Sequence, residues 1–329
     1  MARIGLVGFF GWGNYGDELF LELWRQRLGR FHDVKVVHDL LHEPYFSRRA
    51  AEVAGEYDAF VIGGGDLVIP TKISSLYWNS AWLSKPVFIA GVGVPTWMKS
   101  ENRDVVERMS KFFQHPNVRY IGARDDESAD WIRRRLQPTV PVTSHADLVF
   151  SMDMPPARTY ERPTVGLVVR QQRSGGADLS RVEAACREIA AQGYDIARIV
   201  LGNLGTGERD VEVASALDVP GEVLYSESTD EMSSNLGGLE ALISMKFHGT
   251  VVATAYGVPS IVLSSTSKSQ NLYRRIDRLP LLSSLTDDAL LEKFAMTKLR
   301  VPQIVRDALR ADALQGVRNV VDSVNGEVG

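Results

Sequence analysis

The feature that most constrains how this chain can fold is a repeated alternation of short apolar runs with stretches of helical spacing. Runs such as "RIGLVGF" and "KPVFIAGVGV" have the character of buried strands, and amphipathic stretches such as "ELFLELWRQRL" separate them. This alternation is typical of strands that are joined by helices around a parallel sheet. A second series of the same kind begins with "TVGLVV" at residues 164–169. We therefore predict an α/β fold with two doubly wound domains.

The length of 329 residues suits two domains, and one segment interrupts the pattern. This segment, "SMDMPPARTYERP" at residues 151–163, is rich in proline and has no apolar period. We predict an N-terminal domain over residues 1–155 and a C-terminal domain over residues 156–329. A helical region over residues 301–324 closes the chain, and it could pack on either domain. Two such domains would leave a cleft between the carboxyl ends of their sheets, where open α/β folds bind ligands.

Composition narrows the kinds of partner and the compartment. A formal net charge of -4 argues against a dedicated nucleic-acid binder, because such proteins carry a basic excess. The single cysteine, Cys186, excludes a disulfide within the chain, and its helical spacing predicts a packed apolar side chain. No apolar run approaches the length of a membrane span. We expect a cytoplasmic protein that binds small anions or sugars and that could still touch the inner face of the membrane.

The first turn between strand and helix, "GFFGWGNYGD" at residues 8–17, is rich in glycine. Glycines there let backbone N–H groups and a helix N-terminus grip an anion. The spacing fits neither a Walker loop nor a dinucleotide fingerprint. Two interpretations stay open: a tight turn whose helix Asp17 caps, or a ligand site that includes Asn14, Gly16 and Asp17.

Two further strand ends in the first half carry candidate site residues. "VIGGGD" at residues 61–66 ends in more glycines than a turn requires, which favours contact of a ligand with Gly64, Gly65 and Asp66. "YIGARDDES" places Arg124 just beyond a strand and before a helix that Asp125 or Asp126 would cap. Arg124 could clamp a carboxylate or phosphate with its two-pronged guanidinium, or it could pair with neighbouring aspartates.

The most informative segment is "ALISMKFHGTVVATAYGVPSIVL" at residues 241–263. A strand over 241–245 delivers Lys246 and His248 into a turn, Gly249 opens a helix and Gly257 ends it. A histidine beside a lysine at such a turn is a candidate for proton transfer. Lys268 follows the next strand, so these three side chains could converge at one edge of the sheet.

Two other groups of residues bear on the predicted site, one through its charge and the other as possible metal ligands. Arg170 and Arg173 follow the first strand of the second domain and could add positive charge to the cleft. Four other histidines show no metal-ligand spacing with cysteines or carboxylates, so we infer no metal site; these are His32, His38, His42 and His115.

Taken together, "GNYGDE", "IGGGDL", "ARDDES" and "MKFHGTVVATAYGVPSI" make the chain resemble the polysaccharide pyruvyltransferase family. The family motif Gly-x-x-Asn-x-Gly-Asp-Glu falls on residues 11–18. The motif Arg-x-His-(Gly/Ala) falls on residues 246–249, with Lys246 in place of the usual arginine. Lysine keeps the charge but loses the two-pronged fork.

The resemblance implies the activity and the roles of residues. Members of this family move a pyruvyl group from phosphoenolpyruvate onto sugar hydroxyls, with no metal or redox cofactor. Their fold is similar to that of two-domain glycosyltransferases of the GT-B type, with two Rossmann-like domains that face each other across a cleft. The basic catalytic trio of the family falls on Arg124, His248 and Lys268. Lys246 and Arg170 would help to bind the donor. The acceptor would be a sugar on a lipid-linked or polymeric glycan.

The resemblance leaves some points open. Residues 14–17 would line the first-domain side of the cleft, where they would meet either the acceptor sugar or the phosphate end of the donor. Two other functions remain as alternatives: a nucleotide-sugar glycosyltransferase of the same two-domain type, and a catalytically silent sugar- or nucleotide-binding module. The oligomeric state is not predicted.

Overall fold

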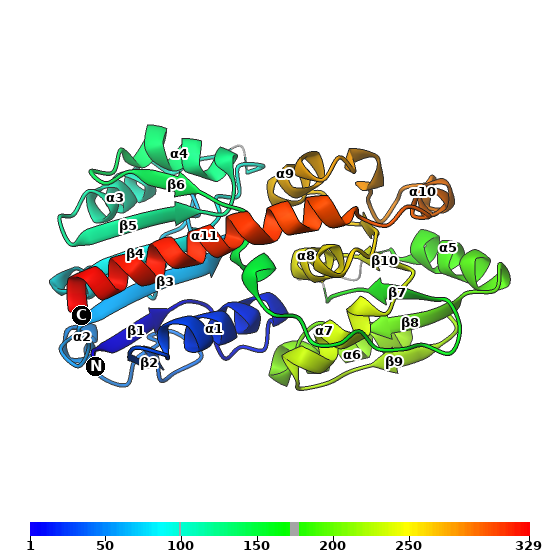
Figure 1. Cartoon of the computed structure of the whole chain (residues 1–329), viewed down its shortest axis with the longest axis horizontal. Helices are drawn as coiled ribbons and strands as arrows, with labels where there is room; N and C mark the ends of the chain where they lie inside the picture. The colour runs from blue at the N-terminus through cyan, green and yellow to red at the C-terminus, as the bar shows by residue number, and fades with distance from the viewer. Residues whose placement is uncertain (99, 172–177) are drawn as a thin grey trace. The chain divides into compact units, whose positions relative to one another are not determined.

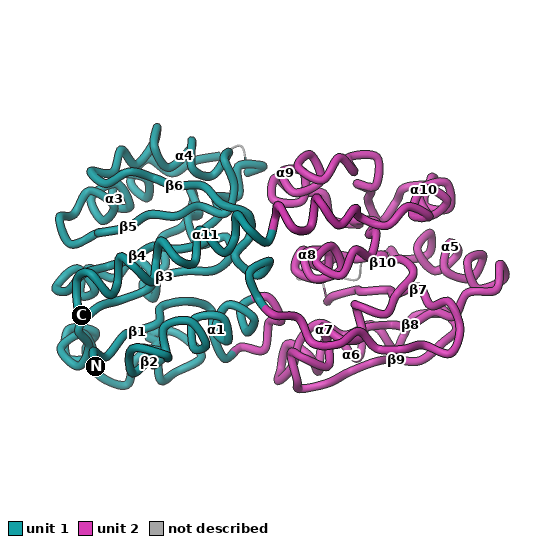
Figure 2. Tube along the Cα trace, viewed as in Figure 1, with its two compact units in different colours: residues 1–11, 17–152, 310–329 teal, residues 12–16, 153–309 magenta. Residues whose placement is uncertain are grey.

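The computed structural model describes residues 1–98, 100–171 and 178–329, which form two compact units (Figure 2). Unit 1 contains residues 1–11, 17–152 and 310–329, and unit 2 contains residues 12–16 and 153–309. The chain passes between them at Met152 and Asp153, inside the proline-rich segment. Two segments depart from the expected halves: residues 12–16 group with unit 2, and the last residues, 310–329, group with unit 1.

The described part of unit 1 is built on a six-stranded parallel sheet in the order β2-β1-β3-β4-β5-β6 (Figure 1). Its strands are β1 (Arg3–Val7), β2 (Asp33–Val36), β3 (Ala59–Gly65), β4 (Val87–Val92), β5 (Val118–Ala123) and β6 (Val142–Ser144). Its helices are α1 (Tyr15–Leu28), α2 (Ala50–Ala54), α3 (Arg103–Phe113) and α4 (Asp126–Leu136), with short 3-10 turns at Ser80–Ser84 and Leu148–Ser151. The first two residues of α1 belong to unit 2.

The described part of unit 2 is built on a five-stranded parallel sheet in the order β11-β10-β7-β8-β9. Its strands are β7 (Thr164–Val168), β8 (Asp195–Ile199), β9 (Glu222–Leu224), β10 (Ala241–Ser244) and β11 (Ser260–Val262). Its helices are α5 (Ser180–Ala191), α6 (Leu204–Ala216), α7 (Thr229–Gly237), α8 (Phe247–Tyr256), α9 (Ser267–Arg275) and α10 (Leu290–Met296), with a 3-10 turn at Leu279–Leu281. Helix α11 (Gln303–Val328) begins in unit 2 and ends in unit 1.

The terminal part of α11 is fixed to unit 1 by specific contacts. Nε2 of His32 lies 2.7 Å from Oδ1 of Asn325. Gly316 lies so close to Leu148 that an added Cβ would stand 2.9 Å from its side chain. These contacts explain why residues 310–329 group with the first unit.

Each sheet reverses its strand order at one point, and the loops next to this point are candidates for ligand binding. In unit 1 the chain leaves β1 for β2 on one side and returns to β3 on the other. In unit 2 it runs outward from β7 to β9 and returns to β10 beside β7. Open α/β sheets bind ligands beyond the carboxyl ends of the strands at such points. The loop after β1 carries the first glycine-rich motif and the turn after β10 carries Lys246 and His248, whereas Arg124 follows β5 and Lys268 follows β11.

The structure bears on the predictions for Cys186 and for membrane-spanning segments. Cys186 is completely buried in α5, and burial raises the pKa of its thiol to about 12, so it is a packed side chain as predicted. In the described ranges, no helix is both long enough and apolar enough to cross a membrane.

Candidate active site

The carboxyl end of β10 delivers His248 into the first turn of α8. Lys246 is the N-cap of this helix, which begins at Phe247. The prediction that Gly249 opens the helix was therefore wrong by two residues. Gly249 packs closely in this first turn, because an added Cβ there would lie 2.6 Å from the side chain of Leu201. Gly257 ends the helix in the left-handed conformation, with φ of 84°, as predicted.

Lys246 is held by a buried ion pair. Its Nζ lies 2.5 Å from Oδ2 of Asp210 and donates a hydrogen bond of 2.5 Å to the carbonyl oxygen of Leu201. The other carboxylate oxygen of Asp210 accepts a hydrogen bond of 2.9 Å from the backbone N–H of Gln171. Asp210 therefore ties the segment after β7 to the segment after β10, at the point where the strand order reverses.

Sequence reasoning did not single out Asp210, although the sequence holds a signal. The buried side of α6 contains Gly207, Asp210 and Ala214, which are spaced as one face of a helix. A carboxylate on the buried face of a helix needs a partner, because an unpaired charge there is costly. That partner is Lys246.

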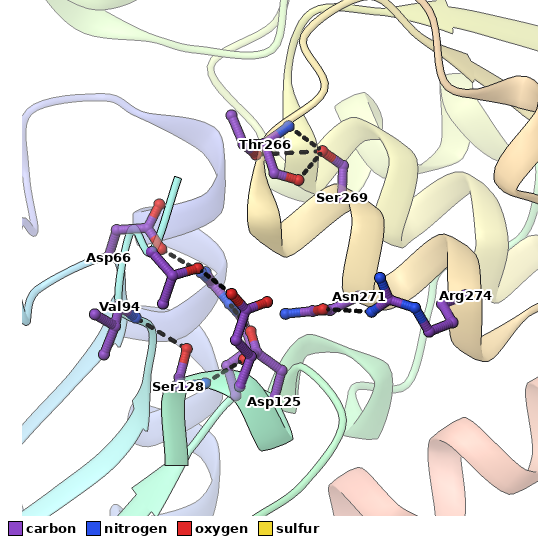
Figure 3. Close-up of polar contacts among 11 residues, drawn as sticks. Asp66, Val94, Asp125, Ser128, Thr266, Ser269, Asn271 and Arg274 are labelled. Carbon is purple, nitrogen blue, oxygen red and sulfur yellow. Dashed lines mark hydrogen bonds and ion pairs between the residues drawn. The ribbon is translucent and has the colours of Figure 1, made fainter. Parts of the chain in front are cut away.

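Lys268 lies on the ring that adjoins His248. Its Nζ stands 5.3 Å from the ring centroid of Phe247, and the Phe247 and His248 ring centroids are 5.3 Å apart. Lys268 lies in the first turn of α9, as predicted. The start of this helix is fixed by Thr266, whose backbone N–H donates to Oγ of Ser269 at 2.8 Å (Figure 3).

The segment Trp12–Gly16, from the first glycine-rich loop, is part of unit 2 and is anchored there. Oγ1 of Thr206 donates to the carbonyl oxygen of Trp12 at 2.7 Å. The backbone N–H of Asn203 donates to the carbonyl oxygen of Gly13 at 2.9 Å. Gly13 has φ of 77°, and an added Cβ would stand 1.9 Å from the carbonyl oxygen of Asn203. Glycine is required at this position on both counts.

Two further contacts complete the anchoring of this segment. Asn14 forms an antiparallel bridge with Gly202. The buried hydroxyl of Tyr15 lies 2.6 Å from Oγ of Ser233. The next residue, Gly16, packs directly against the imidazole of His248. This contact between the first glycine-rich loop and the predicted catalytic histidine was not predicted from the sequence.

In unit 1, Arg124 lies at the carboxyl end of β5 and is paired with Asp66 beyond the end of β3. Its side chain is only 3% exposed. Gly93, beyond the end of the intervening strand β4, leaves room for the guanidinium, because an added Cβ there would stand 2.2 Å from Nη2 of Arg124. Of the two interpretations left open for Arg124, the structure shows pairing with aspartates: Nη2 pairs with Asp66, and Nε lies 3.9 Å from Oδ2 of Asp125.

The surroundings of Arg124 are acidic. Burial by itself lowers the pKa of Arg124, but negative charges nearby outweigh this effect and raise its pKa above the ordinary value. These charges belong to Asp66, Asp147 and Asp125. Asp125 also caps α4, as predicted, by accepting the backbone N–H of Ser128 at 2.7 Å, and Oγ of Ser128 accepts the N–H of Val94 at 3.0 Å (Figure 3).

The glycines at the end of β3 have packing reasons of their own. An added Cβ would stand 2.0 Å from the carbonyl oxygen of Ala90 at Gly63, and 2.6 Å from the ring of Phe20 at Gly64. Gly64 and Gly65 also have positive φ values of 94° and 87°. Packing and backbone conformation therefore account for this run of glycines without a ligand.

Asp17 does not cap α1. The helix begins at Tyr15, so Asp17 lies inside its first turn, where its negative charge suits the helix dipole. Asp17 is buried, and its Oδ1 stands 3.4 Å from where a Cβ would lie on Gly65. The loops after β1 and β3 thus meet in unit 1 as well.

The structure distributes the predicted site residues over the two units. Unit 2 holds Asn14, Gly16, Arg170, Lys246, His248 and Lys268, and unit 1 holds Asp17, Gly64, Gly65, Asp66 and Arg124. Arg170 is exposed beyond the end of β7, and Arg173 lies outside the described residues. In the part of the chain that is described, no three histidine, cysteine, aspartate or glutamate side chains gather in a way that could hold a metal ion.

Solved structures with the same fold are enzymes that act on sugars. The UDP-GlcNAc 2-epimerase from Neisseria meningitidis, bound to UDP-GlcNAc, is 11% identical; the match covers 98% of this chain and 100% of that chain, with a TM-score of 0.60. The glycotransferase of kitacinnamycin is 13% identical, with coverage of 100% and 99% and a TM-score of 0.53. The calicheamicin glycosyltransferase CalG4 is 14% identical, with coverage of 100% and 98% and a TM-score of 0.50.

These likenesses establish two Rossmann-like domains of the GT-B type, as predicted. No curated protein sequence matches the chain. The family model described as "Polysaccharide pyruvyl transferase" matches residues 14–267, a range that begins in the glycine-rich loop and ends at the start of α9. The chain belongs to the polysaccharide pyruvyl transferase family.

Proposed function

We propose that this chain transfers the pyruvyl group of phosphoenolpyruvate to two hydroxyls of a sugar in a cell-envelope or exopolysaccharide glycan. The product is a cyclic ketal, and phosphate is released. The observation that supports this proposal is the position of His248 in the first turn of α8, with Nζ of Lys268 5.3 Å from the ring centroid of the adjacent Phe247, in a member of this family.

The reaction needs one proton donor and acceptor and a set of fixed positive charges. A proton is added to the methylene carbon, a sugar hydroxyl attacks the central carbon, phosphate leaves, and a second hydroxyl closes the ketal. One hydroxyl proton replaces the proton given to the carbon, and the other leaves with phosphate. Histidine exchanges protons near neutral pH, so we assign these transfers to His248.

We assign donor binding to unit 2. Phosphoenolpyruvate carries a carboxylate and a phosphate, which suit Lys268 and the N-terminus of α8. Arg170 would add charge from the end of β7. Lys246 is neutralised by Asp210, so we assign it mainly to holding the start of α8 in place. The balanced reaction needs no oxidant or reductant, and we propose that it uses no cofactor besides the donor substrate.

We assign acceptor binding to unit 1. Its strand ends present Asp66, Asp125 and Asp147 around a single guanidinium, that of Arg124. Carboxylates accept hydrogen bonds from sugar hydroxyls, whereas an excess of negative charge disfavours an anionic donor. In this assignment Arg124 supports catalysis by holding Asp66, and Asp17 belongs to the same acceptor side. We propose that the acceptor is met in the cytoplasm, at the inner face of the membrane if it is lipid-linked.

The test is incubation of the protein with phosphoenolpyruvate and a panel of cell-envelope glycans, with phosphate and glycan mass followed together. We expect phosphate release that depends on one glycan and a matching pyruvyl mass gain. Phosphate release without that mass gain would contradict transfer. Thermal stabilisation by nucleoside diphosphates but not by phosphoenolpyruvate would favour a nucleotide-sugar glycosyltransferase instead.

A pair of lysine variants makes this test specific to the site. Lys268→Met should raise the KM for phosphoenolpyruvate. Lys298→Met is the matched control, because Lys298 also lies over an aromatic ring of unit 2, with Nζ 4.9 Å from the Tyr194 centroid. Equal effects of the two substitutions would contradict a donor-binding role for Lys268.

A further inference from the structure

Gly16 and His248 lie in contact within unit 2. A Cβ placed on Gly16 would stand 1.8 Å from Nδ1 of His248 and 2.4 Å from Cε1 and Cγ. In real structures a Cβ essentially never lies within 3.0 Å of a heavy atom to which it is not bonded. The imidazole therefore fills the space that a side chain at position 16 would need.

The backbone at Gly16 does not itself require glycine. Its φ lies outside the left-handed range, in contrast to Gly11 and Gly13 with φ of 84° and 77°. Gly16 is also the second residue of α1, a position where alanine is a better helix former than glycine. The close approach of His248 is thus the physical reason for glycine at this position.

Gly16 cannot easily move away from the ring. The preceding residues are fixed to α6 and α7 through Thr206, Asn203 and Ser233. Tyr15, its direct neighbour, is 1% exposed and is hydrogen-bonded through its hydroxyl. On the other side of the contact, His248 is fixed at the start of α8 next to Phe247. Two anchored helix starts therefore hold Gly16 and the imidazole of His248 in contact.

We infer that Gly16 is a positioning residue for His248: its missing side chain sets where the imidazole lies. The consequence for turnover rests on the proposed function, in which His248 moves protons. The part of the inference that concerns the place of the ring does not depend on that function.

The first measurement is the activity of Gly16→Ala in the full chain. A shift of about 1 Å in a reacting group can cost about 100-fold in rate, so we expect a loss of this order in kcat with little change in the KM for phosphoenolpyruvate. Gly205→Ala is the matched control. Gly205 is the second residue of α6, and an added Cβ there would meet nothing closer than 3.9 Å. Wild-type kcat in Gly16→Ala would overturn the part of the inference that concerns turnover.

The second measurement follows the ring directly. The protein is prepared with ring-labelled histidine, and the His248 signals are identified by their loss in His248→Ala. We expect displaced His248 ring signals in Gly16→Ala and unchanged ones in Gly205→Ala. Unchanged ring signals in Gly16→Ala would overturn the inference even if activity fell.

A third measurement covers the outcome in which Gly16→Ala is poorly folded. Gly16→Ala is compared in the wild-type and His248→Ala backgrounds by the midpoint of thermal unfolding. If the ring is the obstacle, the loss in midpoint should vanish once the ring is removed. An equal loss in both backgrounds would overturn the inference. The comparison of the two backgrounds and the ring signals can both be measured in a protein that does not transfer pyruvyl groups. A failure of the proposed function would therefore appear separately, as absent activity in the wild-type protein.

Discussion

Nζ of Lys246 lies 2.5 Å from Oδ2 of Asp210, and the two side chains are 11% and 5% exposed. The pair joins α6 to the start of α8, the helix whose first turn carries His248. A buried pair of this kind contributes little net stability compared with apolar residues, yet the loss of one partner leaves an uncompensated buried charge. The pair therefore fixes the geometry of the site more than it adds to overall stability.

Asp210→Asn should lower the free energy of unfolding by about 3–5 kcal/mol, because it removes the negative charge of a buried ion pair 2.5 Å from Nζ of Lys246. The double variant Lys246→Met with Asp210→Leu should recover most of this loss. Urea unfolding measures both. Asp195→Asn is the control, because it breaks an exposed pair with Arg162 of unit 2 and should cost no more than about 1 kcal/mol. Equal losses for the two aspartates would contradict this account.

His248→Ala should lower kcat for pyruvyl transfer by at least about 100-fold, the lower end for a positioned proton-transfer group. The KM for phosphoenolpyruvate should change less, since the lysines and helix N-terminus remain. His42→Ala is the control, because His42 is exposed in unit 1 and its Nδ1 lies 3.0 Å from the carbonyl oxygen of the adjacent Glu43. Near-normal turnover in His248→Ala would remove the proposed role of this residue.

Gly93→Ala should destabilise the protein by about 1–3 kcal/mol, the usual cost of overpacking. An added Cβ would stand 2.2 Å from Nη2 of Arg124 and 2.6 Å from Oδ1 of Asp66, so the buried pair must shift. Gly326→Ala in α11 is the control, since an added Cβ there meets nothing within 4 Å. Urea unfolding of both variants tests the prediction, and a wild-type midpoint in Gly93→Ala would show that the pair moves freely.

The sequence predicted what depends on local pattern. The alternation of strands and helices, the cap at Asp125, the end of α8 at Gly257 and the start of α9 near Lys268 all follow from residues adjacent in the chain. These features are set by propensity and backbone conformation, which short stretches of sequence encode directly.

The contacts that shape the candidate site are of another kind. Arg124 pairs with Asp66, Lys246 with Asp210, and Gly16 packs on His248, and in each case the partners come from distant parts of the chain. The spacing of hydrophobic residues places such side chains at a strand end or on a helix face. It does not indicate which acidic side chain pairs with which basic one. The membership of residues 12–16 in unit 2 was missed for the same reason.

The contribution of Asp287 to the stability of the folded protein should depend on pH. Hydrogen bonds from Ser283 and Lys293 lower its pKa from 3.8 to about 2. Because the folded state favours the charged form, Asp287 stabilises the protein above the unfolded value of 3.8, and this contribution is lost as the pH falls through about 2. Asp287→Asn should therefore be less stable than the wild type at pH 7.

The difference in free energy of unfolding between wild type and Asp287→Asn should stay constant from pH 7 to about 5 and shrink below the unfolded pKa of 3.8. Urea unfolding at a series of pH values measures it. Asp288→Asn is the matched control, because the neighbouring Asp288 side chain is 75% exposed and pairs only at the surface, with Arg181, so its effect should be small at every pH. A difference for Asp287→Asn that grows as the pH falls would contradict the charged, hydrogen-bonded state of this carboxylate.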